Sequence, residues 1–470
     1  MIPALNASNI YSTLGNPNSL VPMAVKDIAN SCGLTAGSYI AGDKLEGKDR
    51  FIDEFGTQAI WLFGIPAYKK IIDWTLYKAL KIDPAFDVRN LKDTRKNILE
   101  KSIQYADNSI KESMKTASKN QKFTKNLAMG KFIVSTALTI LSYAGLTKYR
   151  HQNTKKNAEK EILAELAAKQ PGSQTAKESG KWKVESGKSN NFQFSTFNFP
   201  TDKVLSPYRH IALSPKDMQP SFTGSIQDFM YNPVKNLMLL DASITTERLA
   251  HSRNKQDLIG YTIKEGTFWA FMYFASKPIQ KFFEKRADNN TKKPVSIDLD
   301  ARVIESKELE KAISNGTLKL STEKILKLET QEQLLDYIHN NPDDFTVQMA
   351  KKSDVLPTLK NAAQADNVDY RKFIDLDEFK GVAEKLSKLN DKFEQFKLTD
   401  LKDKSLEAFL KNVKKVKRAS ILKNMGACIG VLGVLAPAIM VLTRKMDKDN
   451  QGFQVKEDLK KQMAFNGKLA

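Results

Sequence analysis

The sequence predicts an all-α, helical integral membrane protein, and three observations lead to this fold class. Residues 424–443 form a run of 20 residues without a charged side chain, which is the length a helix needs to cross a bilayer. Short patterns of the first half recur in the second, which indicates two related halves. Residues 295–420 are rich in charge and helical in their periodicity, which indicates a soluble helical insertion in the second half.

Composition limits how much of the chain can face lipid. The 470 residues suffice for two or three domains. Because only 41 % are hydrophobic, we exclude a polytopic transporter made mostly of lipid-facing helices. Two cysteines, Cys32 and Cys428, exclude a disulfide scaffold. The residues before Lys26 lack a basic start followed by an apolar run, so no cleaved signal peptide is expected.

The first half is expected to contain one membrane span. Residues 1–22 are rich in Asn, Ser and Pro and predict a loose lead-in. Residues 23–150 follow as the first membrane-associated half, which ends in a second candidate span at residues 127–147, interrupted by Lys131. The aromatic run 55–68 is too short to cross a bilayer and contains Gly64 and Pro66, so an interfacial helix is predicted there.

The second half follows a linker. Residues 151–232 are predicted to be a largely irregular linker, and residues 233–294 start the second membrane-associated half with an aromatic run at 266–276. In the insertion, Thr330 and Gln333 match a capping box. A seam of apolar residues with heptad spacing predicts a helix that packs lengthwise, most simply within the chain: Phe379, Val382, Leu386, Leu389, Phe393 and Phe396.

The last span has two kinds of candidate contact. Its helix is expected to continue from the segment 401–417 into residues 421–445, followed by a loosely ordered polar tail at 446–470. Small residues predict close packing with another membrane helix at Gly426, Gly430 and Gly433. Basic residues beside the span predict contacts with anionic lipids at Lys414, Lys415, Lys417, Arg418, Arg444 and Lys445.

An internal echo supports the two halves. The glycine of Met129-Gly130 is matched by that of Met425-Gly426, 296 residues later, and both spans end in Leu-Thr followed by a basic residue. Gly56-Thr57 is matched by Gly266-Thr267, 210 residues later, and each pair opens an aromatic run. The order of these motifs is the same in both halves, as a duplication would leave it.

No catalytic, cofactor or metal site is predicted. The four histidines, His151, His210, His251 and His339, have no ligand at metal-binding spacing. Gly187-Lys188-Ser189 lacks the earlier glycine of a phosphate-binding loop. The run 447–452 resembles half of a calcium loop, but Asp458 stands where that loop requires Glu.

The net charge of +20 is assigned to the membrane surface instead of nucleic acid. Lysine greatly outnumbers arginine, aromatic residues do not interleave with the basic runs, and the densest runs adjoin the spans. Expected partners are therefore the lipid bilayer and a protein that binds the 295–420 region.

The predicted role is that of a membrane-anchored scaffold or interaction protein, and not an enzyme. Two alternatives stay open: a small pore or transport unit made of the duplicated halves, and a secreted effector that inserts into membranes. Against a pore, the only ionisable residues expected within the membrane are Lys131 and Glu265. Between one and four crossings are compatible with the sequence, and the orientation is not fixed because both sides of each span are basic.

Overall fold

The computed structural model describes residues 7–15, 20–42, 44–91, 96–169, 226–252, 255–352, 363–364, 367–399, 404–445 and 455–465. These residues are almost entirely helical, which confirms the predicted all-α class. The exception is an antiparallel pairing of β1 (Ala363–Gln364) with β2 (Asn367–Val368). Gly187-Lys188-Ser189 and the calcium-like run 447–452 lie outside the described residues.

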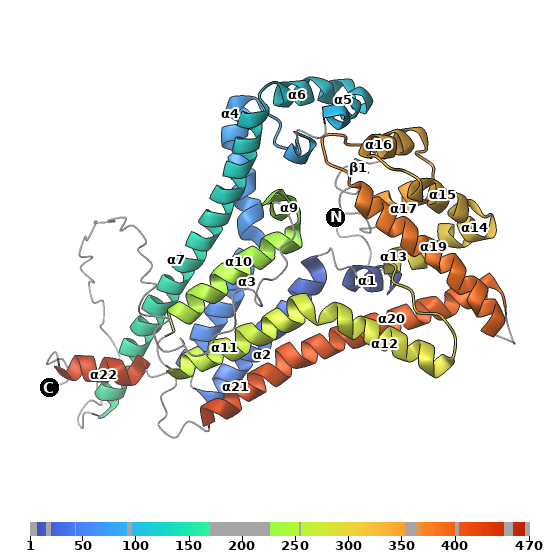
Figure 1. The fold of residues 1–470 in the computed structure, drawn as a ribbon. Helices are drawn as coiled ribbons and strands as arrows, with labels where there is room; N and C mark the ends of the chain where they lie inside the picture. Colours follow the sequence, from blue (N-terminus) through green and yellow to red (C-terminus); the bar gives the residue numbers. More distant parts are fainter. Residues whose placement is uncertain are drawn as a thin grey trace, which may run out of the picture.

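Six helical segments lie side by side in the left half of Figure 1, and we call this part the bundle. Contacts between segments are most extensive where α3 packs on α7 and α2 packs on α3. The segments are α2 (Leu20–Ala41), α3 (Lys44–Ile72), α7 (Gln121–Lys169), α10 (Pro233–Ala250), α11 (Lys255–Trp269), and α20 (Leu406–Gly430) continued by α21 (Ala436–Lys445).

Three bundle segments contain a turn of π-helix, in which the backbone is wider than in an α-helix. These turns are η1 (Asp73–Tyr77), which joins α3 to α4 (Lys78–Leu80), η5 (Ala270–Phe274), which joins α11 to α12 (Ser276–Thr291), and η6 (Val431–Leu435), which joins α20 to α21. At η5 the carbonyl oxygen of Phe271 accepts a hydrogen bond from Lys26 Nζ at 3.4 Å. The carbonyl group of this wide turn therefore forms a contact between η5 and α2.

A helical domain packs on the outer half of α20, on the right of Figure 1, and extends along the top of that view to α7. Its buried apolar side chains form one contiguous core, which residues 86–132 share with the predicted insertion 295–420. The elements are η2 (Val88–Leu91), α5 (Lys96–Tyr105), α6 (Asn108–Lys119), α9 (Ile226–Tyr231), α13 (Ala301–Glu305), α14 (Lys307–Ser314), α15 (Thr317–Leu326), α16 (Gln331–Asn340), α17 (Phe345–Lys352) and α19 (Leu376–Thr399).

Several local predictions are confirmed in this domain. Thr330 and Gln333 form both hydrogen bonds of the capping box at the start of α16. The seam of α19 faces the core: five of its six residues are buried, and half-buried Phe393 packs on Phe409 with 5.3 Å between ring centroids. The predicted continuation into the last apolar run is also present, because α20, η6 and α21 form one helical segment, Leu406–Lys445.

The structure differs from the sequence predictions in four places. Residues 151–169, assigned to the largely irregular linker 151–232, continue α7 as a helix. The lead-in contains α1 (Ala7–Leu14) and the start of α2. Gly64 and Pro66 do not interrupt α3: Pro66 lies on the exposed face, while a Cβ at Gly64 would lie closer than 3.0 Å to Thr139 of α7, so that glycine permits close packing. The tail contains α22 (Val455–Phe465), whose Leu459 packs against the end of α7.

The bundle and the helical domain are also joined by an ion pair. Arg371, which follows β2, places its Nη1 atom 2.7 Å from Asp83 Oδ2, in the segment after α4. Burial alone would raise the pKa of Asp83, but the backbone N–H of Ala85 and the Arg371 guanidinium together hold it below its usual value. The carboxylate is therefore charged at neutral pH and the connection is formed.

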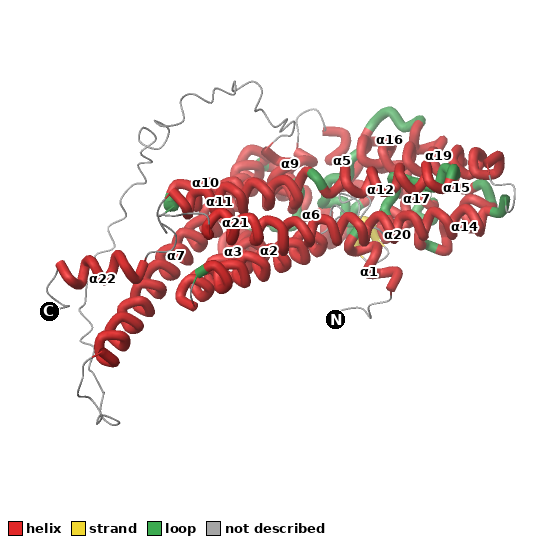
Figure 2. The backbone as a smooth tube through the Cα atoms, turned by 90° about the horizontal axis from the view of Figure 1, so that it is seen from below, coloured by secondary structure: helices red, strands yellow, loops and turns green. Residues whose placement is uncertain are grey.

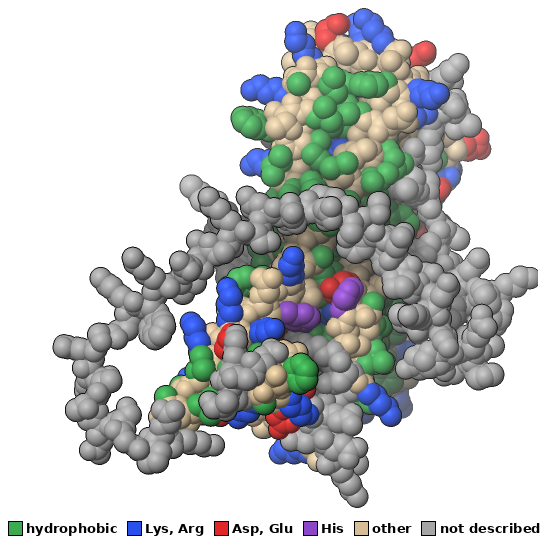
Figure 3. All heavy atoms as spheres, turned by 90° about the vertical axis from the view of Figure 1, so that its left-hand side faces the viewer, with side chains coloured by type: hydrophobic (Ala, Val, Ile, Leu, Met, Phe, Trp, Pro, Cys, Tyr) green, Lys and Arg blue, Asp and Glu red, His purple; other side chains and the backbone are tan. Residues whose placement is uncertain are grey.

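The outer surface of the bundle carries an uncharged belt. It comprises residues 20–42, 51–68, 126–147, 233–250, 258–275 and 424–443. Among the side chains of these ranges whose exposure is described, every charged one is buried or half-buried. Instead, large apolar side chains are exposed, among them Ile28, Phe63, Leu138 and Val434. Figure 3 shows such side chains gathered on the face that α7 presents. At 1.5 Å per residue, 18 to 23 residues span about 27–35 Å.

Candidate functional site

The interior of the bundle is charged, in contrast to its surface. The buried carboxylates and cations come from α2, α3, α7, α10 and α11. These helices lie close together in Figure 2. The buried groups are Lys26, Asp27, Glu46, Asp49, Asp53, Glu54, Arg150, Asp241, Arg248, Lys264 and Glu265. We take this group as the candidate functional site, because buried ionisable groups need partners or a ligand.

Helical spacing places these side chains inward. On α3 the buried face runs through Glu46, Asp49, Asp53, Thr57 and Trp61, at intervals of three or four residues. This interval keeps side chains on one face of a helix. The other face of α3 carries Phe51, Ala59 and Phe63 and is exposed. The helix is therefore amphipathic with its polar side turned inward.

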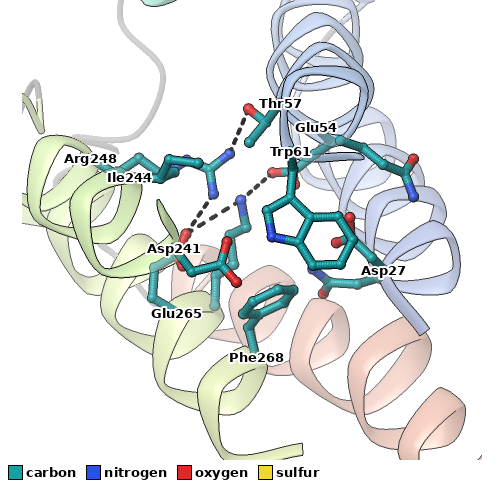
Figure 4. A pocket seen from close by; sticks show the side chains of 12 residues that line it. Asp27, Glu54, Thr57, Trp61, Asp241, Ile244, Arg248, Glu265 and Phe268 are labelled. Carbon is teal, nitrogen blue, oxygen red and sulfur yellow. Dashed lines mark hydrogen bonds and ion pairs between the residues drawn. The ribbon is translucent and has the colours of Figure 1, made fainter. Parts of the chain in front are cut away.

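Arg248 of α10 lies at the centre of the ion pairs. Its Nη1 atom is 2.6 Å from Glu265 Oε1, and its Nη2 atom is 3.4 Å from Asp53 Oδ1. Asp53 is also paired with Arg150 of α7, at 2.7 Å. Lys264 of α11 lies 2.8 Å from Glu54. Lys264 also lies 3.5 Å from Glu265, towards which Arg248 points in Figure 4. One network therefore connects α3, α7, α10 and α11.

A small cavity adjoins this network. Its volume of ≈ 20 Å³ is enough for about one water molecule. In Figure 4 the Trp61 indole lies between the carboxyl groups of Asp241 and Asp27, with Phe268 below it. The lining consists of Asp27, Asn30, Glu54, Thr57, Gln58, Trp61, Asp241, Ile244, Arg248, Lys264, Glu265 and Phe268.

The formal charges around the cavity do not balance. Four carboxyl groups line it, those of Asp27, Glu54, Asp241 and Glu265, against the two cations Arg248 and Lys264. With every group ionised the lining would carry 2 − 4 = −2. Including Asp49 and Asp53 with the cations that pair with them, Arg50 and Arg150, adds two charges of each sign and leaves the difference unchanged. Such an excess in a buried site requires protons or cations for compensation.

Two carboxyl groups account for the excess. Asp241 accepts a hydrogen bond from Tyr273 but has no ion pair with a described residue, and Asp27 has neither a hydrogen bond nor an ion pair with one. Polar atoms beside them are also unsatisfied: both side-chain atoms of Asn30 and the Nε2 atom of Gln58 have no hydrogen-bond partner among the described residues. Asn30 is only 1 % exposed. The cavity thus contains unused donors and acceptors next to excess negative charge.

The glycines predicted to pack in the membrane occupy different environments. Gly426 and Gly430 are exposed, and a Cβ added at either would meet nothing within 4 Å. Neither glycine packs on another helix of the part of the chain that the structure describes, so they remain candidates for a contact between chains. Gly433 lies in η6 against Ala29 of α2. A Cβ added at Gly33 of α2 would clash with the backbone of Gly433. The close approach is therefore between α2 and η6.

Three of the residues predicted to contact anionic lipid are used inside the chain. Lys417 is buried and bonds Glu284 at 3.0 Å, Arg418 pairs with Glu305 at 2.6 Å, and Arg444 pairs with Glu46. Burial leaves Lys417 unable to reach a headgroup. Of the others, Lys414 is half-buried, and Lys415 and Lys445 are exposed.

The sequence reasoning missed the interior site because it judged each segment by its uncharged length. Asp53-Glu54 and Lys264-Glu265 stand directly before the short aromatic runs 55–68 and 266–276, yet both pairs lie inside continuous helices. The polar residues of α2 give a further signal. The available signal was the spacing of Lys26, Asn30 and Ser38 with Asp27, Ser31 and Thr35, which places polar residues on one helix face.

No group of three or more His, Cys, Asp or Glu side chains in the described part of the chain is arranged to hold a metal ion. Two helical segments, Gln121–Ala168 and Leu406–Lys445, are long and apolar enough to cross a membrane. Comparison with protein families, with characterised proteins and with solved structures finds no match. The chemistry of the bundle interior is consequently the basis for a function.

Proposed function

We propose that this protein is a multi-span membrane protein whose bundle binds and transfers a proton or a small monovalent cation. The observation that carries the proposal is the excess of two negative charges around the interior cavity. This charge excess favours the transport alternative over a scaffold with a single anchor. The objection that ionisable residues are scarce within the membrane segments does not apply to the interior found here.

The membrane setting is supported by the pattern of exposure. A core helix of a soluble protein is mostly buried, whereas only 33 % and 28 % of the most apolar windows of Gln121–Ala168 and Leu406–Lys445 is buried. The uncharged belt extends the same property to α2, α3, α10 and α11, and its height matches the ~30 Å hydrocarbon layer. Ionisable residues that face the interior of such a bundle commonly mark ion pathways. All six segments would then cross the bilayer.

The side chains suggest separate roles. The paired cations Arg150, Arg248 and Lys264 and their carboxylates hold four helices in register, which is a structural role. Asp27 and Asp241 come from α2 and α10, outside these pairs, and can accept a proton or coordinate a cation together with the Asn30 amide. A single water in the cavity would supply a further oxygen ligand.

Replacing both Asp27 and Asp241 by Asn should abolish ion transfer without unfolding the protein. The amide keeps the shape of the side chain and removes the uncompensated charge. We expect wild-type proteoliposomes to dissipate an imposed pH or potassium gradient, measured with a pH-sensitive dye or a potassium electrode. The double variant should reduce this rate at least about ten-fold.

A matched control is Asp377→Asn with Asp391→Asn, two exposed carboxylates of α19, which should leave the flux unchanged. Thermal unfolding of both double variants should occur at or above the wild-type midpoint. Flux that persists in the Asp27 and Asp241 variant would refute their role. Absence of flux from wild-type protein, for both ions, would refute transport.

The two related halves belong to the same proposal. Glu54 and Lys264 are equivalent positions in the internal echo, 210 residues apart, and their side chains form an ion pair. In each half the aromatic segment also packs beside an apolar one: α3 on α7, and α11 and α12 on α21 and α20. A contact between equivalent residues is expected close to a pseudo-symmetry axis. The match is partial, since Gly56 packs on Leu146 whereas Gly266 has an open environment.

A scaffold is the second candidate, and one observation favours it. The helical domain has a cavity of ≈ 490 Å³ between α14, α15 and α17, a volume that accommodates side chains of a partner. A protein without flux that retains binding through this domain would fit this candidate. The third possibility, a secreted effector, requires the protein to be a soluble monomer after gentle lysis.

A further inference from the structure

A groove rich in lysine lies between α12 and α19, away from the bundle interior. Its volume is ≈ 350 Å³, within the range of small-ligand sites. The lining consists of Lys281, Glu284, Lys285, Ser296, Ile297, Asp298, Lys385, Lys388 and Lys392. None of the lipid contacts predicted from the sequence is among these residues. The groove was therefore not apparent from the basic residues beside the last apolar run.

The positive charge of the groove is only partly neutralised. Five lysines line it together with two carboxylates. One of these, Glu284, is buried and occupied by Lys417 Nζ at 3.0 Å and by Ser420. The other, Asp298, lies 3.6 Å from Lys281 and 3.9 Å from Lys385.

Asp298 reports the positive field in the groove. Burial alone would raise the pKa of this carboxyl, but the ammonium groups of Lys385, Lys281 and Lys277 hold it below its usual value. Lys285 and Lys388 project from opposite helices of the groove, and neither has an ion pair or hydrogen bond with a described residue. Both side chains are exposed. They are free to bind an anion.

The groove lies just beyond one edge of the uncharged belt. Asn424, the first residue of the last apolar run, donates a hydrogen bond from Nδ2 to Ser276 Oγ at 2.9 Å, which aligns the start of α12 with this edge. Lys281 and Lys285 follow Ser276 by five and nine residues, which is about 7 and 14 Å along α12. Between them, Phe282 is 59 % exposed. An aromatic residue flanked by lysines suits the headgroup region.

We propose that this groove binds a phosphate group, presented by the headgroup of an anionic lipid. Lysine binds phosphate as a point charge, and the converging ammonium groups of two helices provide several such charges around one cavity. The height above the belt places a lipid phosphomonoester within reach of Lys285, and Lys388 lines the same groove from α19. A soluble phosphate has the same chemistry, and the experiment separates these two sources. The proposal does not depend on ion transfer by the bundle.

Replacing Lys285 and Lys388 by Gln should weaken binding about 30-fold, or roughly five-fold for each lysine. Binding is measured by calorimetry with the full chain in neutral detergent micelles. The probes are dioctanoyl phosphatidic acid, dioctanoyl phosphatidylcholine and pyrophosphate. The matched control is Lys311→Gln with Lys324→Gln, two exposed lysines that line the other cavity of the same domain. This control should bind as the wild type does.

The outcomes separate clearly. Tighter binding of phosphatidic acid than of pyrophosphate or phosphatidylcholine, lost in the Lys285 and Lys388 variant, supports the lipid headgroup. Equal or tighter binding of pyrophosphate, with the same loss in the variant, supports a phosphate site but assigns it to a soluble ligand. If neither phosphate probe binds, or if the variant binds them like the wild type, the proposal is overturned. Unchanged thermal midpoints verify that both variants are folded.

Discussion

Replacing Arg248 by Met should lower the free energy of unfolding by about 3–5 kcal/mol. The guanidinium is 6 % exposed and contacts Glu265, Asp53 and the Tyr143 hydroxyl. Its removal leaves one more uncompensated negative charge in an interior that already has an excess. The free energy is measured by titrating the protein from mild detergent into SDS while following the loss of tertiary structure.

Two further variants show whether charge is the cause. Arg286→Met, on the exposed side of α12, should change stability by less than about 0.5 kcal/mol. Adding Glu265→Gln to Arg248→Met should recover part of the loss, because it removes a carboxylate left without its partner. A cost below about 1 kcal/mol for Arg248→Met would mean that water screens the network, contrary to the proposed membrane setting.

Replacing Gly33 by Ala should destabilise the packing of α2 on the last apolar segment by about 1–3 kcal/mol. A Cβ at this position would lie closer than 3.0 Å to the Gly433 carbonyl and to the Pro437 ring. Neither the backbone nor a proline ring can move aside cheaply, so the two helices must separate. The same SDS titration measures the effect.

Gly430→Ala is the matched control, because it adds the same methyl group to the segment that α2 packs on, at a position where nothing lies within 4 Å. We expect it to be neutral or stabilising by up to about 1 kcal/mol, because Ala is a better helix former than Gly. Equal losses for the two variants would show that Gly430 packs as closely as Gly33. In that case a contact between chains, visible as a changed oligomeric state, would be the explanation.

The sequence was informative where local pattern decides structure. The apolar run 424–443, the capping box at Thr330 and the seam of α19 depend on residues close together in the chain, and the helices form as these patterns predict. The sequence argument underestimates helix length where it ends a segment at a charge or a proline. In α3, Asp53 and Glu54 face inward and Pro66 faces outward, so neither stops the helix.

The interior site could not be found in the same way. Glu54 and Lys264 are 210 residues apart, and Asp53 and Arg150 also belong to different helices. A charged residue considered alone is predicted to be exposed. Only the packing of several helices shows that it has a partner. The lysine groove is similar, since Lys285 and Lys388 come together through the contact of two helices with α20.

The proposal that all six segments cross a bilayer is tested most directly by spin labels placed one at a time on the uncharged belt. Suitable positions in a background lacking both native cysteines are Ile28, Phe63, Leu138 and Val434, all exposed in the structure, with Lys388 as the position in water. In reconstituted liposomes, we expect the four belt positions to be accessible to oxygen and protected from a water-soluble nickel relaxant, with the reverse at Lys388. If Ile28 and Phe63 are as accessible to nickel as Lys388, α2 and α3 do not cross the membrane and the six-segment arrangement is wrong.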